Sequence, residues 1–156
     1  VEKVTSQAME EAYKLRSVIE PQMLGETISK LNKKGEKKIR TALDEYLDAC
    51  QKGSLKLKLV KDIQFHMSIA ELSGQTLSIL ILRYLFDFLY LRLGQELIFS
   101  RPREDSADAH TAIFNAIKSK DIKTATTVLK KHIKNIQKNA LSNIQSRLSE
   151  VEDIVF

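Results

Sequence analysis

Apolar residues recur along most of the chain at intervals of three and four positions, the spacing of one face of an α-helix. Alternation typical of strands is missing, and only five glycines and two prolines interrupt the pattern. Pro21 is expected to bend or interrupt the first helix. Short links between long amphipathic helices favour an all-α antiparallel bundle of six or seven helices. The segments that we predict to be helical are about Thr5–Leu31, Glu36–Gln51, Leu55–Leu72, Thr76–Phe99, Glu104–Ser119 and, from a cap at Asp121, a last helix to about Glu150.

The three histidines of the chain, His66, His110 and His132, lie on the apolar stripes of three different predicted helices. Asp62 lies one turn before His66, so both side chains project from the same helix face. Three imidazoles and one carboxylate are therefore expected to meet at one interior point. Because Zn, Ni, Co and Mn accept this set of nitrogen and oxygen ligands, the pattern predicts a divalent transition-metal site, with zinc as the first choice.

A simpler interpretation exists for each histidine taken alone, namely a core imidazole satisfied by a hydrogen bond. The four residues together are harder to explain in that way. Burying Asp62 and three imidazoles without a shared ion would cost several kcal/mol. We therefore favour one metal site over four unrelated core residues.

The composition fits a single globular domain over residues 1–156, since 43% of the residues are apolar and 29% are charged. The most apolar stretch, Leu77–Leu93, is interrupted by Arg83, Asp87 and Arg92, which favours a bundle helix over a membrane span. A lone cysteine, Cys50, and the lack of a visible signal peptide favour a cytoplasmic location. The chain does not begin with Met, and we expect it to be a piece of a longer protein.

The net charge of +5 comes with two groups of lysines, around residues 33–38 and 123–138. Such groups can form a nucleic-acid footprint, but they are also typical of solvated outer helix faces. The second interpretation is favoured, because the lysines alternate with core positions at helical spacing, lack aromatic neighbours and accompany no known nucleic-acid-binding motif.

Three segments resemble a known family. KDIQFHMSIAELSGQ resembles the D-x-x-F-H-x-x-I-A-x-x-S-G-N signature of the FCD domain, the effector-binding half of GntR-family transcription regulators of the FadR subfamily. DSADAHTAIFNAIKSKDIKTATTVLKKHI is similar to its E-H-x-x-I-x-x-A-I-x-x-x-D-x-x-x-A segment, which is followed by a His on the last helix. Leu15-Arg16 with Ile19-Glu20-Pro21 is similar to its opening R-x-x-L-E-P. The order and spacing of the three match over nearly the whole chain.

The resemblance implies that Asp62, His66, His110 and His132 hold the metal, and that a small organic acid binds there through a carboxylate. It also implies a homodimer that contacts DNA only through a winged helix-turn-helix domain, which would precede these residues, and no contact with membranes. Two departures stand out. Gln75 replaces the usual Asn after Ser-Gly, which bears on the shape of the pocket, and Asp108-Ala109 precedes His110 where the family commonly has Glu.

Five further residues are candidates for contacts with the effector. Arg92 can hold a carboxylate with two parallel hydrogen bonds, although a salt bridge to Glu96 explains it equally well. Arg16 can act in the same way, but its spacing to Glu20 favours an intrahelical pair. The remaining candidates, by their position in the signature or on the His132 face, are Gln75, Asn135 and Asn139.

The main alternative is a metal-dependent hydrolase, because an ion with open positions can activate water. The sequence lacks H-E-x-x-H, paired E-x-x-H repeats, glycine-rich phosphate loops and a nucleophile elbow. A helical interaction module without a ligand is a third possibility. We therefore expect a sensor and not an enzyme.

Overall fold

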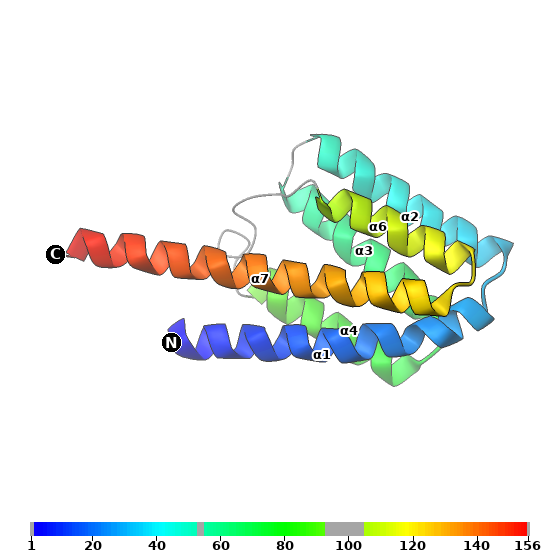
Figure 1. Cartoon of the computed structure of the whole chain (residues 1–156), viewed down its shortest axis with the longest axis horizontal. Helices are drawn as coiled ribbons and strands as arrows, with labels where there is room; N and C mark the ends of the chain where they lie inside the picture. The colour runs from blue at the N-terminus through cyan, green and yellow to red at the C-terminus, as the bar shows by residue number, and fades with distance from the viewer. Residues whose placement is uncertain (1, 53–54, 93–104, 156) are drawn as a thin grey trace.

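The computed structural model describes the backbone of residues 2–52, 55–92 and 105–155, and the side chains of residues 6–52, 56–90 and 107–142. Within these ranges every regular element is helical (Figure 1), which confirms the predicted all-α fold. A π-helical turn, η1 (Asp87–Arg92), continues the fourth helix. The six α-helices are α1 (Glu2–Ser29), α2 (Lys33–Lys52), α3 (Leu55–Ser73), α4 (Thr76–Phe86), α6 (Asp105–Lys118) and α7 (Ile122–Val155).

Successive helices alternate in direction and form an antiparallel bundle (Figure 1). Helix α1 packs against α7, α3 and α4, whereas α2 packs against α3 and α6. Helix α6 in turn packs against α7. The helices α3, α6 and α7 therefore surround the centre of the bundle, with α1 closing it from another side. No helix of the described residues is both long enough and apolar enough to cross a membrane.

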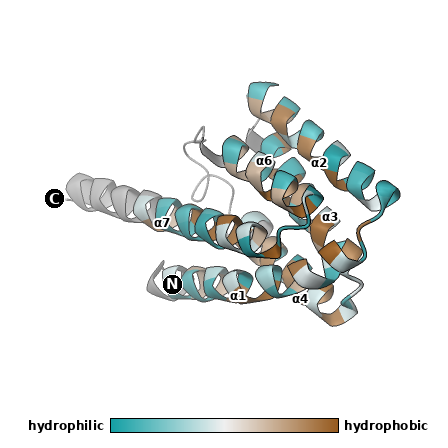
Figure 2. Cartoon of the chain, turned by 45° about the vertical axis from the view of Figure 1, so that its right-hand side comes forward, coloured by the Kyte–Doolittle hydropathy of each residue, from teal (hydrophilic) through white to brown (hydrophobic). Residues whose placement is uncertain are grey.

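The apolar positions of each helix face the interior, as the spacing predicted. On α2 the buried residues Ile39, Leu43 and Tyr46 recur at intervals of three and four, and the residues between them are exposed apart from the half-buried Ala42. Figure 2 shows the result as alternating hydrophilic and hydrophobic segments along α2 and α6. This arrangement fixes which side of every helix is available for an interior site.

Helix α1 runs through Pro21 without interruption, so of the predicted bend or interruption at this residue the interruption is wrong. Proline removes one backbone hydrogen bond and clashes with the preceding turn, at a cost of about 3 kcal/mol. Buried residues on both sides of Pro21 offset this cost, among them Tyr13, Met23 and Leu24, each at most 1% exposed. Packing against the core therefore keeps the two halves in one helix.

The fourth helix ends earlier than predicted, at Phe86, and continues as the π-helical turn η1. Such π-helical turns are rare and occur mostly as single turns within α-helices. Here Leu89 and Tyr90 are both fully buried, and the Tyr90 hydroxyl accepts a hydrogen bond from Arg16 of α1 at 2.8 Å. The rest of the predicted helix, residues 93–99, lies outside the described residues.

The other predicted helix ends lie within about five residues of the observed ones, and the largest difference is at the end of α7, which reaches Val155 and not Glu150. Gly74 follows α3 with φ +70°, a conformation that glycine adopts without strain. Asp121 caps α7, because its Oδ1 accepts a hydrogen bond from the backbone N–H of Thr124 at 3.0 Å and its Oδ2 one from the Thr124 hydroxyl at 2.6 Å.

Candidate metal centre

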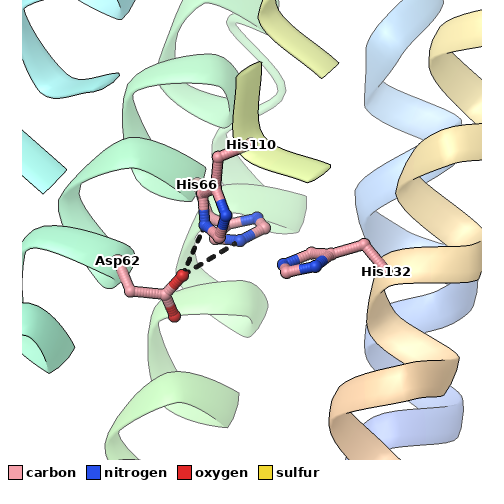
Figure 3. A group of neighbouring side chains, drawn as sticks. All are labelled: Asp62, His66, His110 and His132. Atoms are coloured by element: carbon pink, nitrogen blue, oxygen red, sulfur yellow. Dashed lines mark hydrogen bonds and ion pairs between the residues drawn. The ribbon is translucent and has the colours of Figure 1, made fainter. Parts of the chain in front are cut away.

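Four side chains from three helices meet in the interior of the bundle. Helix α3 supplies Asp62 and His66, α6 supplies His110 and α7 supplies His132, and all four residues are buried. One potential ligand atom from each residue lies within 4.8 Å of the others. Figure 3 shows the three imidazoles and the carboxylate converging from these helices. The stripe positions read from the sequence therefore do bring the four predicted ligands together.

Asp62 is the centre of this cluster. Its Oδ1 accepts a hydrogen bond from His110 Nε2 at 2.6 Å, and His66 Nε2 lies 3.5 Å from the same oxygen. The rings of His66 and His132 are nearly parallel, with centroids 5.4 Å apart. Among the described residues, neither His66 Nε2 nor His132 Nε2 has a hydrogen-bond partner. Two buried nitrogens are thus left unsatisfied beside a carboxylate.

The charges around the cluster shift the ionisation of its members in opposite directions. Burial alone would raise the pKa of Asp62, but its contacts with His110 and His66 hold that pKa well below its ordinary value. Burial alone would lower the pKa of His66, yet the carboxylates of Glu20 and Asp62 raise it to about 9. Burial, with the neighbouring imidazoles, holds the pKa of His132 well below its ordinary value. His132 is therefore neutral at pH 7, as a metal ligand must be.

A second layer of polar residues supports His66. Its Nδ1 lies 3.1 Å from Glu20 Oε1, which leaves Nε2 to face the cluster. Glu20 is in turn held by Arg16, whose Nη2 donates to both carboxylate oxygens at 3.2 and 3.3 Å. The guanidinium also lies over the ring of Phe86, 4.5 Å from its centroid. Carboxylates that fix the tautomer and orientation of a histidine are typical of metal sites.

The donor set fits a divalent transition metal. Three imidazole nitrogens and one carboxylate oxygen are the ligands that zinc and its neighbours take in proteins. The unsatisfied Nε2 atoms of His66 and His132 are buried, and an ion at this point would give both of them a partner. The group of four residues can therefore hold a metal ion.

The comparisons with known proteins point to the same family as the sequence motifs. The model of the FCD domain family matches residues 11–135, which include all four residues of the cluster. The chain belongs to the FCD family. A search of the curated proteins gave no match to this FCD domain.

Solved structures of regulators share the fold of this FCD domain. Streptococcus agalactiae GntR superposes with a TM-score of 0.74 at 22% sequence identity, covering 86% of this chain and 60% of that protein. E. coli McbR/YncC superposes with a TM-score of 0.69 at 15% identity, covering 90% of this chain and 69% of that protein. At these identities the likeness establishes the fold alone. The chain corresponds to only part of the length of either regulator.

A small cavity of about 10 Å³ adjoins the cluster in this FCD domain. This volume holds about one water molecule. Residues from α1, α3, α4 and α7 line it: Glu20, Met23, His66, Ile69, Ala70, Leu82 and Leu129. A small organic acid is larger than this space.

The five predicted effector contacts lie in different surroundings. Arg16 is fully buried and bound to Glu20 and Tyr90, so the intrahelical pair predicted for it is present. Gln75 accepts a hydrogen bond from Gln22 at 2.8 Å, where α4 begins. The other two described candidates are Asn135, which is exposed, and Asn139, which is half-buried. None of these four candidates lines the cavity. The side chain of the fifth, Arg92, lies outside the described residues.

Sequence reasoning missed the contact between Glu20 and His66. Only the pairing of Glu20 with Arg16 follows from local spacing, because the two residues are one turn apart on α1. The distance from Glu20 to α3 depends on how the helices pack. No pattern in the sequence indicates it.

Replacing Arg16 with methionine is expected to destabilise this FCD domain by about 3–5 kcal/mol, because the change leaves the Glu20 carboxylate buried without its cation. Chemical denaturation measures the loss. The matched control is Lys14→Met, since Lys14 pairs with Glu10 on the exposed side of the same helix. We expect the control to change stability by less than about 1 kcal/mol. Equal losses in the two variants would contradict a structural role for the buried pair.

Proposed function

We propose that this chain is the effector-sensing domain of a GntR-family transcription regulator, and that it binds a small organic acid at a divalent metal. In this proposal Asp62, His66, His110 and His132 hold the metal, with zinc as the first choice. The observation that carries it is the convergence of four buried ligand atoms within 4.8 Å in a domain of the FCD family. One carboxylate and three neutral imidazoles around a divalent ion give a net charge of about +1, which attracts an anionic oxygen donor.

We assign DNA binding to a part of the protein outside residues 1–156. We propose that a winged helix-turn-helix domain precedes residues 1–156, and that the acid shifts a dimer between arrangements that do and do not bind the operator. The two regulators that share this fold, S. agalactiae GntR and E. coli McbR/YncC, support this assignment. The chain spans about 60% of the length of S. agalactiae GntR, so the full protein is expected to be longer.

The polar residues behind His66, Glu20 and Arg16, fit a sensor better than a hydrolase. A hydrolytic metal site needs a general base close to the bound water. The described carboxylate beside the cluster, other than Asp62, is Glu20, and it is engaged by Arg16 and His66. The binding role is tested by native mass spectrometry of freshly purified chain. We expect one divalent ion per chain and an added acid of low mass, whereas bare protein that takes up no metal on addition would overturn the proposal.

The pH dependence of stability provides a separate test. Without metal, the pKa of His66 is raised to about 9 from an ordinary 6.5, so His66 gains a stabilising proton on folding. This stability is fully present below pH 6.5 and is lost as the pH rises to about 9. Chelator-treated protein should therefore lose up to about 3 kcal/mol over this range. With zinc the sign reverses, because a proton on His66 competes with the ion and zinc binding strengthens as the pH rises.

Denaturation of chelated and zinc-loaded protein at pH 6.5, 7.5 and 8.5 measures both slopes. Glu20→Gln is the control, because it removes the carboxylate that contributes most to the raised pKa of His66. In this variant, the chelated protein should lose less stability as the pH rises from 6.5 to 8.5. If the free energy of unfolding changes with pH in the same way with chelator and with zinc, the ion does not bind at His66.

A further inference from the structure

The two groups of lysines in the sequence have different surroundings in the structure. Helix α2 carries four acidic residues besides its lysines, and Lys38 forms an ion pair with Glu71 of α3 at 2.7 Å. Residues 122–149 of α7 contain five lysines and one arginine but no acidic residue. These five lysines are exposed, and within the described part of the chain no carboxylate forms an ion pair with them. Helix α7 therefore carries positive charge that the described residues do not neutralise.

The exposed lysines of α7 lie on one face of the helix. At about 100° per residue, all five fall within an arc of about 100°. The opposite side of α7, with the buried Leu129 and His132, belongs to the side that packs against α1 and α6 (Figure 1). The lysines extend over fifteen residues, or about 22 Å of helix. We call these five residues the α7 lysine face: Lys123, Lys130, Lys131, Lys134 and Lys138.

The spacing of these lysines is unfavourable for the helix itself. Lys130 and Lys138 each lie four residues from Lys134, the distance at which like charges on a helix repel. Lys123 lies in the first turn, where the helix dipole disfavours a positive charge. The nearest acidic residue along the chain, Asp121, uses both carboxylate oxygens in the cap of α7. A bound polyanion would relieve this repulsion.

The composition of the α7 lysine face indicates the chemistry of its partner. The centre of a protein interface and a membrane-binding helix both need apolar or aromatic side chains. Within residues 123–138, the one other position in the same arc is Thr127, which is polar. Single-stranded nucleic acids are bound largely by stacking on aromatic rings, and this face has none. The phosphate backbone of a duplex, in contrast, is bound by positive charge alone.

We propose that the α7 lysine face binds the phosphate backbone of double-stranded DNA without sequence preference. Its length of about 22 Å corresponds to about six base pairs at about 3.4 Å each. This contact is additional to recognition of the operator, which we assign to the preceding domain. In the proposed regulator it would add affinity for DNA beside the operator. That role rests on the proposed function, whereas DNA binding by the chain alone does not.

Fluorescence anisotropy of the 156-residue chain with a random duplex of about 30 base pairs tests the proposal. We expect a dissociation constant on the order of 1–10 µM at about 50 mM salt, and about 100-fold weaker binding at about 150 mM. The double variant Lys130→Gln with Lys134→Gln should reduce the slope of log affinity against log salt by about two. The matched control is Lys33→Gln with Lys37→Gln, which removes the same charge from exposed positions four residues apart on α2. This control should leave the slope nearly unchanged.

A charge reversal separates DNA binding from folding. Lys134→Glu should weaken DNA binding at about 50 mM salt by at least about 10-fold. The new carboxylate lies one turn from both Lys130 and Lys138, so the helix should be at least as stable as in the unaltered chain. Thermal melts followed by circular dichroism measure this stability. A variant that folds and does not bind DNA identifies the face as the contact.

Three results would overturn the proposal. The first is that the unaltered chain does not bind the duplex at about 50 mM salt. The second is that the α2 control reduces binding as much as the α7 double variant, which would show a general effect of net charge. The third is that polyglutamate of equal total charge displaces the duplex as well as unlabelled duplex does, which would favour an acidic protein as the partner. Zinc should change none of these outcomes, because His132 is on the opposite side of α7.

Discussion

Replacing His132 with alanine is expected to lower the affinity of the chain for zinc by about 100-fold or more. Loss of an outer partner of a metal ligand already costs about 10–100-fold, and His132 is one of only four proposed ligands. Its Nε2 has no hydrogen-bond partner among the described residues, so the imidazole contributes little to the metal-free cluster. Binding of zinc should therefore suffer much more than folding. Competition with a chromophoric chelator measures the affinity.

A second substitution at the same position separates ligation from packing. His132→Leu fills most of the space of the imidazole and removes an unsatisfied buried nitrogen, so the chelated protein should be at least as stable as the unaltered chain. It should nevertheless lose zinc binding as completely as His132→Ala. The matched control is Lys134→Ala, because Lys134 is exposed on the same helix. If both His132 variants bind zinc as tightly as this control, His132 is not a ligand.

The centre of the fold could be predicted from the sequence because periodicity determines which side of a helix is buried. Asp62 and His66 are one turn apart, and His110 and His132 replace apolar residues on the stripes of α6 and α7. Burial of those stripes is enough to bring the four side chains together. The group of four proposed ligands is therefore the part of the site that the local sequence pattern determines.

Other features depend on packing between helices and could not be predicted. Glu20 reaches His66, and Arg16 reaches Tyr90, only because α1 lies at a particular rotation against α3 and η1. The continuity of α1 through Pro21 has the same origin, since burial on both sides outweighs a local preference. The size of the cavity likewise follows from the spacing of four helices. None of these features produces a periodic pattern in the sequence from which it could be predicted.

Small organic acids are expected to stabilise the domain only when it holds the metal. The proposed ion provides the positive charge that anchors a carboxylate, whereas the residues beside it in the cavity are mostly apolar and include the anionic Glu20. At about 100 times its dissociation constant, a ligand adds about 2.7 kcal/mol to the free energy of unfolding. For a domain of this size the melting temperature should rise by about 5–11 °C. Metal-free protein should show no rise.

Thermal melts of zinc-loaded and stripped protein with lactate, malate, succinate, citrate and sugar acids measure this difference. Zinc retained by the protein is assayed in parallel, because citrate can remove the ion, and lactamide and succinamide serve as ligands without a carboxylate. Arg92→Ala should reduce the shift if Arg92 holds the far end of the acid, and Arg83→Ala on the exposed side of α4 is its control. Equal shifts in the two metal states would show that the acid binds elsewhere. Turnover of any of these acids would favour a metalloenzyme, because a sensor has to release its ligand unchanged.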